Sequence, residues 1–128
     1  MTEILNFIGG EWVPALSGKT LENFEPATGR AYSTLPASDA TDIEKAVSAA
    51  KRAFPAWSSL PARERASYLR AISESSRMSL EEFSRAESID TGKPISVARK
   101  IDIPRAALNF EFFADAATQF ASESHLTG

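Results

Sequence analysis

Cysteine is absent from this sequence of 128 residues. Its absence excludes disulfide bonds, thiolate metal ligands and a thiol nucleophile within the chain. Histidine occurs once, at His125, and no other metal-binding residues cluster around it in the sequence. We therefore expect His125 to be a surface residue and not a metal ligand. Long apolar runs are also missing, since none approaches the roughly 20 residues needed to cross a bilayer.

An excess of basic charge is missing as well. The chain has 14 Lys and Arg against 17 Asp and Glu, a net charge of −3. A nucleic-acid partner would demand a basic stripe, so none is expected. The first residues include Glu3, where a secretory signal would carry basic residues. We predict a cytoplasmic protein without a membrane partner, large enough for one domain and, at 43% apolar residues, for a core.

The first 37 residues predict two pieces that resemble β-hairpins. Residues 6–8 and 11–13 flank Gly9-Gly10, and both glycines accept the positive φ of a two-residue turn. Residues 21–24 and 31–35 flank the sequence PATG at residues 26–29, in which proline and glycine favour a turn.

Helical spacing begins at Thr41. Thr41 and Glu44 have the spacing of a capping box, which predicts the start of a first helix. Pro55 is expected to end this helix. One apolar stripe follows from the i, i+3, i+4, i+7 and i+11 spacing of Ile43, Ala46, Val47, Ala50 and Phe54.

Two further helices are predicted before residue 93. Pro61 suits the first turn of the second helix. Ser79 and Glu82 form another possible capping box, at the start of the third helix. Gly92 provides the C-terminal stop of that helix.

The last predicted helix is apolar on two sides. A short helical piece is expected after Pro94, and Asp102 is expected to cap a helix over about residues 103–120. A helix with two apolar faces must be buried on two sides, and the other predicted elements are too few to cover both. We therefore expect either a partner or an absent domain. The first face comprises Ala106, Phe110, Phe113, Ala117 and Phe120, and the second comprises Leu108, Phe112 and Ala116.

Taken in order, these landmarks resemble the aldehyde dehydrogenase superfamily. Each short match is weak alone, but their order and spacing cover nearly the whole chain. Glu25 stands where the family's N-P-A-T-G turn has asparagine. The matching segments are FIGGEW at residues 7–12, EPATG at 25–29, Ala46-Val47 with AAKRAF at 49–54 and Trp57, Glu64-Arg65 with Leu69, and DTGKP at 90–94.

The resemblance implies an α/β fold with a nucleotide-binding domain, a catalytic domain and a β oligomerisation arm. Residues 1–128 would supply N-terminal strands and outer helices that pack on the nucleotide-binding domain, so the domain is incomplete. In the family, a cysteine attacks the aldehyde, hydride passes to NAD or NADP, and a glutamate activates the hydrolytic water. None of these catalytic or cofactor-binding parts matches a residue of this chain. We therefore expect the chain alone to be inactive and to bind no cofactor, and the full-length enzyme to form a homo-oligomer.

Arg105 is the candidate substrate-binding residue. If Asp102 caps the last helix, Arg105 lies in the first turn of that helix. A cation there opposes the helix dipole, which costs about 0.3–1 kcal/mol of stability. The free N–H groups of the same turn favour a bound anion, which an arginine can help to hold. The alternative is a surface arginine paired with Asp102. Residues 101–105 and 109–114 are similar to the branch that oxidises 2-aminomuconic and 2-hydroxymuconic semialdehydes. The resemblance implies that Arg105 binds the acid group of such a substrate.

Asp90 has two interpretations. Its place before Thr91-Gly92 suits turn or C-cap chemistry. The resemblance implies instead that Asp90 helps to hold a structural monovalent cation, together with a backbone carbonyl at Asn23 or Phe24, since oxygen ligands suit a hard cation.

Other prominent residues are expected to be structural. Lys93 is interpreted as a solvated or helix-end lysine. Trp12 and Trp57 are interpreted as packing anchors. The phenylalanines of the last helix are expected in the core, although the resemblance would allow some of them to line an aldehyde tunnel.

Two functional hypotheses remain open from the sequence. The first is the N-terminal piece of an aldehyde dehydrogenase that acts on an acidic semialdehyde. The second is a non-catalytic module that binds dehydrogenase subunits or another partner through an exposed apolar helix. The coding sequence after Gly128 distinguishes the two hypotheses. Under the first, we expect the isolated chain to be marginally stable, associated or partly molten.

Overall fold

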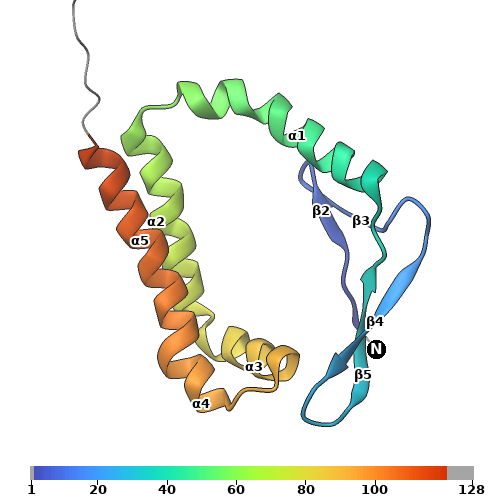
Figure 1. Ribbon diagram of the computed structural model, residues 1–128. Helices are drawn as coiled ribbons and strands as arrows, with labels where there is room; N and C mark the ends of the chain where they lie inside the picture. The colour runs from blue at the N-terminus through green and yellow to red at the C-terminus, as the bar shows by residue number, and fades with distance from the viewer. Residues whose placement is uncertain (1, 121–128) are drawn as a thin grey trace, which may run out of the picture.

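The elements form an open arch, as Figure 1 shows, with the strands on one side and helices α2 and α5 on the other. The computed structural model describes residues 2–120, so the expectation for His125 lies outside the described residues. The mixture of N-terminal strands and later helices confirms the predicted α/β fold class. The elements are β1 (Thr2–Glu3), β2 (Asn6–Ile8), β3 (Glu11–Val13), β4 (Thr20–Glu25), β5 (Arg30–Pro36), α1 (Ala40–Ser59), α2 (Ala62–Met78), α3 (Leu80–Thr91), α4 (Ile95–Val97), the π-helix η1 (Ala98–Asp102) and α5 (Ile103–Gln119).

Both predicted hairpins are confirmed. Strands β2 and β3 pair antiparallel, with Phe7 opposite Trp12 and their ring centroids 4.8 Å apart. Gly9 and Gly10 have φ values of 65° and 92°, as a two-residue turn of this kind requires. Strands β4 and β5 also pair antiparallel. The sequence did not predict β1, which pairs parallel with β5, because two residues are too few to show strand alternation.

Helix α1 begins and ends elsewhere than predicted. Its N-cap is Asp39, whose carboxylate accepts a 2.8 Å hydrogen bond from the Thr41 backbone N–H, while Asp42 accepts one from Asp39. The capping box is therefore made of two aspartates, and the predicted Thr41 box is wrong. The prediction that Pro55 ends the helix is also wrong. Proline removes a single backbone donor, and Pro55 lies near the end of α1, where little of the hydrogen-bond ladder is affected.

Helix α3 begins after Ser79 as predicted, but without the predicted capping box. Ser79 also closes α2, donating its backbone N–H to the Ser75 carbonyl at 3.0 Å. Ser79 has a φ of −95° and a ψ of 21°, which is not the extended conformation that an N-cap residue usually adopts. Its side chain makes no capping hydrogen bond. The C-terminal prediction is confirmed, because Gly92 adopts the left-handed conformation with φ of 74°.

The last helical run does not start at Asp102, and this prediction is wrong. It starts at Ile95 after Pro94, passes through the π turn η1 and continues into α5. Asp102 has a helical φ of −68° and ψ of −53°, and its side chain caps no backbone group. The short helical piece predicted after Pro94 is confirmed as α4.

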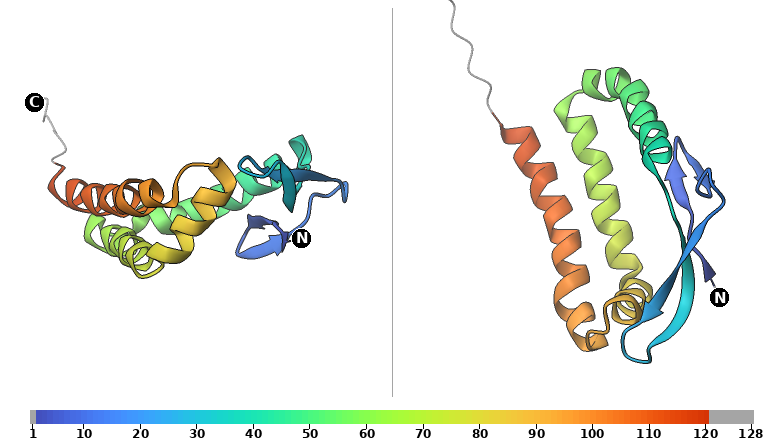
Figure 2. Two further views of the ribbon diagram at one scale, coloured as in Figure 1. Left: turned by 90° about the horizontal axis from the view of Figure 1, so that it is seen from below. Right: turned by 45° about the vertical axis from the view of Figure 1, so that its right-hand side comes forward.

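Large apolar side chains lie outside the small core. The buried apolar residues of the described part of the chain are all alanines, namely Ala15, Ala66, Ala98, Ala107 and Ala114. Helices α2 and α5 lie side by side in both views of Figure 2, and Ala107 and Ala114 of α5 are fully buried. The phenylalanines of α5 are exposed among the described residues, as expected for a helix that lacks its cover, so their place in a core stays a prediction.

The exposed area agrees with two uncovered apolar faces on α5. Leu108, Phe112 and Phe113 are 56%, 65% and 60% exposed. Trp12 and Trp57 are exposed as well, but each packs against one aromatic ring, with centroids 4.8 Å from Phe7 and 5.5 Å from Tyr68. Along residues 2–120, no helix combines the length and apolar character needed to cross a membrane.

Candidate functional site

The turn after α3 fixes the position of Lys93. The Ser88 hydroxyl donates to the Lys93 carbonyl at 2.7 Å, which ties the turn to the end of α3. Gly92 is needed here for its positive φ. A Cβ at this glycine would also lie 2.9 Å from the Pro26 Cβ, so the β4–β5 turn and the end of α3 are in close contact. The backbone at residues 92 and 93 is thereby held from two sides.

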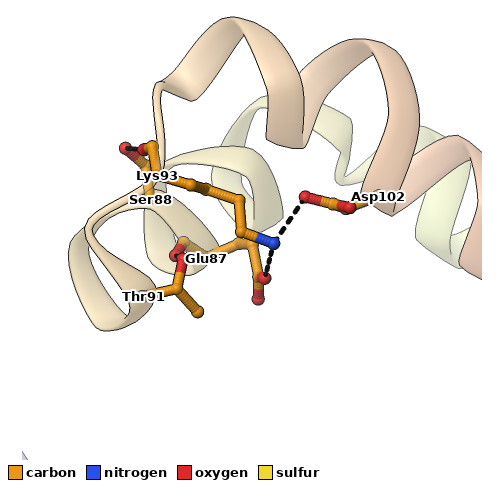
Figure 3. A network of polar contacts seen from close by, with 5 residues as sticks. All are labelled: Glu87, Ser88, Thr91, Lys93 and Asp102. Atoms are coloured by element: carbon orange, nitrogen blue, oxygen red, sulfur yellow. Dashed lines mark hydrogen bonds and ion pairs between the residues drawn. The ribbon is translucent and has the colours of Figure 1, made fainter.

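Lys93 bridges two carboxylates, as Figure 3 shows. Its ammonium lies 2.9 Å from Glu87 Oε1 and 2.8 Å from Asp102 Oδ2. Hydrogen bonds to Asp102 and then to Glu87 raise the pKa of Lys93 above its ordinary value of 10.5. Lys93 is therefore a helix-end lysine, one of the two expected alternatives, and it connects the end of α3 to the last residue of η1.

Arg105 lies three residues beyond Asp102, on an exposed part of α5. Because the helical run starts at Ile95, Arg105 is not in a first turn with free N–H groups, and that part of the sequence argument is wrong. The alternative pairing with Asp102 is not observed either, since Asp102 accepts from Lys93. Within residues 2–120 the Arg105 side chain takes part in no ion pair. Its role in substrate binding stays a prediction.

The surroundings of Arg105 are set by helical geometry. Successive residues turn by about 100°, so Arg105, Asn109 and Phe112 share one stripe of α5. All three are exposed. This stripe lies opposite the stripe of Ala107 and Ala114, which faces α2. A guanidinium, an amide and an aromatic ring therefore lie on the same uncovered face.

Asp90 joins α3 to the strands. Its Oδ1 accepts hydrogen bonds from the Tyr32 hydroxyl at 2.7 Å and from Asn23 Nδ2 at 3.0 Å. The bond from Tyr32, followed by that from Asn23, lowers the pKa of Asp90, and the same contact with Asp90 raises the pKa of Tyr32. The C-cap role belongs to Gly92. Asp90 therefore acts as a tertiary hydrogen-bond acceptor within the described residues.

A hollow of about 630 Å³ lies beside Asp90. Between residues 2 and 120, no three His, Asp or Glu side chains gather as a metal site. A monovalent cation at Asp90 would need further oxygen ligands, so that role stays a prediction. The hollow is lined by Ile4, Asn23, Leu35, Phe83, Ala86, Glu87, Asp90 and Ile103.

Reasoning from the sequence missed most side-chain partners in these networks, including Asp102 as a partner of Lys93. The resemblance placed only a backbone carbonyl, at Asn23 or Phe24, beside Asp90. Asn23 and Tyr32 meet Asp90 from 67 and 58 residues away, and no local pattern marks such contacts. Glu87 meets Lys93 across the Gly92 turn. The C-terminal glycine signal could have indicated that Lys93 folds back towards α3, but it did not identify Glu87 as the partner.

Comparison with known proteins identifies the family. Residues 12–127 match the model described as "Aldehyde dehydrogenase family". The chain belongs to the aldehyde dehydrogenase family. It is 45% identical to the 2-aminomuconic semialdehyde dehydrogenase of Mus musculus, over 94% of this chain and 25% of the relative. It is 38% identical to the 2-hydroxymuconic semialdehyde dehydrogenase of Pseudomonas sp. strain CF600, over 97% of this chain and 26% of that relative.

Solved aldehyde dehydrogenases share the fold. The crystal structure of PnpE in complex with nicotinamide adenine dinucleotide superposes with a TM-score of 0.94 at 36% identity, covering all of this chain and 26% of PnpE. An indole-3-acetaldehyde dehydrogenase complexed with NAD+ gives 0.94 at 31% identity and covers 26% of that chain. These matches confirm the family resemblance drawn from the sequence. The chain spans about a quarter of the length of the relatives that it matches.

Proposed function

We propose that this chain is the N-terminal scaffold of an NAD(P)-dependent aldehyde dehydrogenase that oxidises an acidic semialdehyde to the carboxylic acid. The substrate class is an aldehyde with a carboxylate, such as 2-aminomuconic or 2-hydroxymuconic semialdehyde. Relatives of those names match nearly the whole chain. The observation that carries the substrate proposal is the exposed Arg105, without an ion pair among the described residues.

Arg105 would bind the acid group of the substrate. A guanidinium is planar and can donate two parallel hydrogen bonds to one carboxylate. Asn109 and Phe112 share its stripe, so an amide donor and an apolar surface lie close to the same ligand. Covering this face would exclude water and strengthen the attraction between guanidinium and carboxylate.

We assign no chemical step to the described residues. The chain has no cysteine, and its paired glycines, Gly9 and Gly10, form a turn between two antiparallel strands. A dinucleotide-binding glycine loop lies instead between a strand and a helix. NAD(P) bound elsewhere in the subunit would accept the hydride, so we assign no cofactor contact to this chain. The apolar faces of α5 support the proposal that the rest of a subunit covers them.

A grafted subunit tests the substrate proposal. In it, this chain replaces the matching quarter of the Pseudomonas 2-hydroxymuconic semialdehyde dehydrogenase. Arg105→Ala should raise the KM for the acidic semialdehyde roughly tenfold or more, because a charge-assisted hydrogen bond is lost, and should barely change the KM for a neutral aldehyde of similar size. Arg85→Ala, an exposed arginine on α3, is the matched control. An equal rise for both substrates would contradict the role of Arg105.

The isolated chain tests the scaffold role against a non-catalytic interaction module. The exposed apolar area is compatible with either function. As a scaffold, the chain should neither reduce NAD in the presence of the semialdehyde nor behave as a compact monomer in analytical ultracentrifugation, because its apolar faces associate. Cooperative unfolding from a compact monomer would contradict the scaffold role and favour the module.

A further inference from the structure

Asp102 and Arg105 are natural partners that are kept apart. Residues three apart are neighbours on a helix surface, so an aspartate and an arginine at this spacing normally attract each other. Asp102 nevertheless directs its carboxylate to Lys93, at 2.8 Å, as Figure 3 shows. No ion pair of Arg105 is found within the part of the chain that the structure describes. Asp102 is thus occupied by a cation from outside its own helical run.

The position of Lys93 favours this arrangement. Its backbone is anchored by the Ser88 hydroxyl, and Glu87 contacts the same ammonium from α3. The side chains of Lys93 and Asp102 are 32% and 30% exposed, whereas Arg105 is an exposed residue. Because its turn is fixed at Ser88 and its ammonium also contacts Glu87, Lys93 is held where it can take the Asp102 carboxylate.

The geometry points to Lys93 as a specificity-determining residue: it occupies the Asp102 carboxylate and so keeps Arg105 available to the acid group of the substrate. Lys93 does not touch the substrate and is a positioning residue. If Asp102 were released, it would pair with Arg105, and a substrate carboxylate would first have to displace it. This inference rests on the proposed role of Arg105 in binding the substrate. It adds that the Lys93–Asp102 ion pair keeps Arg105 available for that role.

Kinetics of the grafted subunit test the inference. Lys93→Met should raise the KM for the acidic semialdehyde about two- to fivefold, the effect of competing with one exposed ion pair, while kcat and the KM for a neutral aldehyde stay unchanged. Asp102→Asn should leave the KM near the original value. The double variant Lys93→Met/Asp102→Asn should restore the original KM for the acidic semialdehyde, since the competing carboxylate is gone. Lys100→Met, at an exposed lysine, controls for the loss of one positive charge.

A purely structural role for the Lys93–Asp102 pair gives the opposite pattern. Asp102→Asn alone would then be as harmful as Lys93→Met, and the double variant would not recover. Either result overturns the inference. Should Lys93→Met fail to fold, Lys93→Gln removes the charge but keeps a polar side chain at the turn, and the same KM pattern is expected.

The inference and the proposed function fail in different ways. If Arg105→Ala has no selective effect on the acidic substrate, the proposed function fails. If Arg105→Ala is selective but Lys93→Met is not, the inference fails alone. A crystal structure of the Lys93→Met subunit gives a readout that does not depend on activity. An Asp102–Arg105 pair within about 4 Å supports the inference, and an Asp102 that still points away from Arg105 overturns it.

Discussion

Two junctions hold this chain together by different means. Helices α2 and α5 meet through small side chains: Ala107 and Ala114 are fully buried, and the Ser73 hydroxyl donates to the Ala107 carbonyl at 2.8 Å. Helix α3 meets strands β4 and β5 through polar groups and a turn. Asp90 accepts from Tyr32 and Asn23 there, and Gly92 contacts Pro26.

The difference predicts which change each junction tolerates. The α2–α5 junction depends on close approach of two backbones, so added volume should disrupt it. The α3–strand junction depends on backbone conformation and on charge, so a Cβ at the turn or protonation of a carboxylate should weaken it. Leu108, Phe112 and Phe113 of α5 stay exposed for other contacts.

Gly92→Ala should have the largest effect on stability, and it breaks the α3–strand junction. The φ of +74° costs an alanine about 1–2 kcal/mol. The new Cβ would also lie 2.9 Å from the Pro26 Cβ, which adds about 1–3 kcal/mol of overpacking. Urea unfolding of the grafted subunit, followed by circular dichroism, measures the total loss in unfolding free energy.

Gly18→Ala is the matched control for that change. Gly18 has a similar φ of +68°, but no atom lies within 4 Å of its added Cβ. The Gly18→Ala control should therefore lose only the part of the unfolding free energy that comes from the positive φ. Equal losses for the two variants would show that the contact between Gly92 and Pro26 contributes nothing to the junction.

Ala107→Leu should have an intermediate effect, and it breaks the α2–α5 junction. The added carbon atoms have no space at a fully buried position, so we expect a loss of about 1–3 kcal/mol. Ala116→Leu adds the same volume on the exposed stripe of α5 and should change the unfolding free energy by less than about 0.5 kcal/mol. If urea unfolding gave similar losses for both, the α2–α5 junction would not depend on small side chains.

The sequence predicted most elements because their signals are local. The Gly9-Gly10 turn and the Gly92 stop depend on residues next to each other, and both are confirmed. The predicted helix boundaries were wrong where two possible start signals lay close together in the sequence. Asp39 and Asp42 formed the cap that Thr41 was expected to make, and Asp102 was assigned to a helix start that the π turn η1 removes.

The core and the polar networks could not be predicted in the same way. Apolar periodicity identifies the faces of a helix that need burial, but it did not identify the alanines that are buried within this chain. The partners of Asp90 and Lys93 come from other elements, and only the tertiary fold brings them together. Of the candidate site, the sequence predicted the residues Asp90 and Arg105 but not their surroundings.

The smallest effect is expected from titration of Asp90, and it tests the polar character of the α3–strand junction. Its pKa is lowered from 3.8 in the folded state by Tyr32 and then by Asn23. The unfolded chain therefore binds its proton first as the pH falls. The stability from this carboxylate is fully present above pH 3.8 and is lost as the pH falls through the lower folded-state pKa. Because Asp90 is exposed, water screens the effect and keeps it small.

Tyr32→Phe removes the largest cause of that shift and sharpens the test. The stability difference between the original chain and the variant should be greatest near neutral pH and should shrink as the pH falls below 3.8, because protonated Asp90 no longer favours the Tyr32 hydroxyl bond as strongly. Tyr68→Phe is the control, since Tyr68 lies against Trp57, with ring centroids 5.5 Å apart. Urea midpoints of the grafted subunit and its variants, measured from about pH 6 to about pH 3, give both differences. A Tyr32 difference that does not vary with pH would mean that the junction depends on the shape of the tyrosine and not on the charge of Asp90.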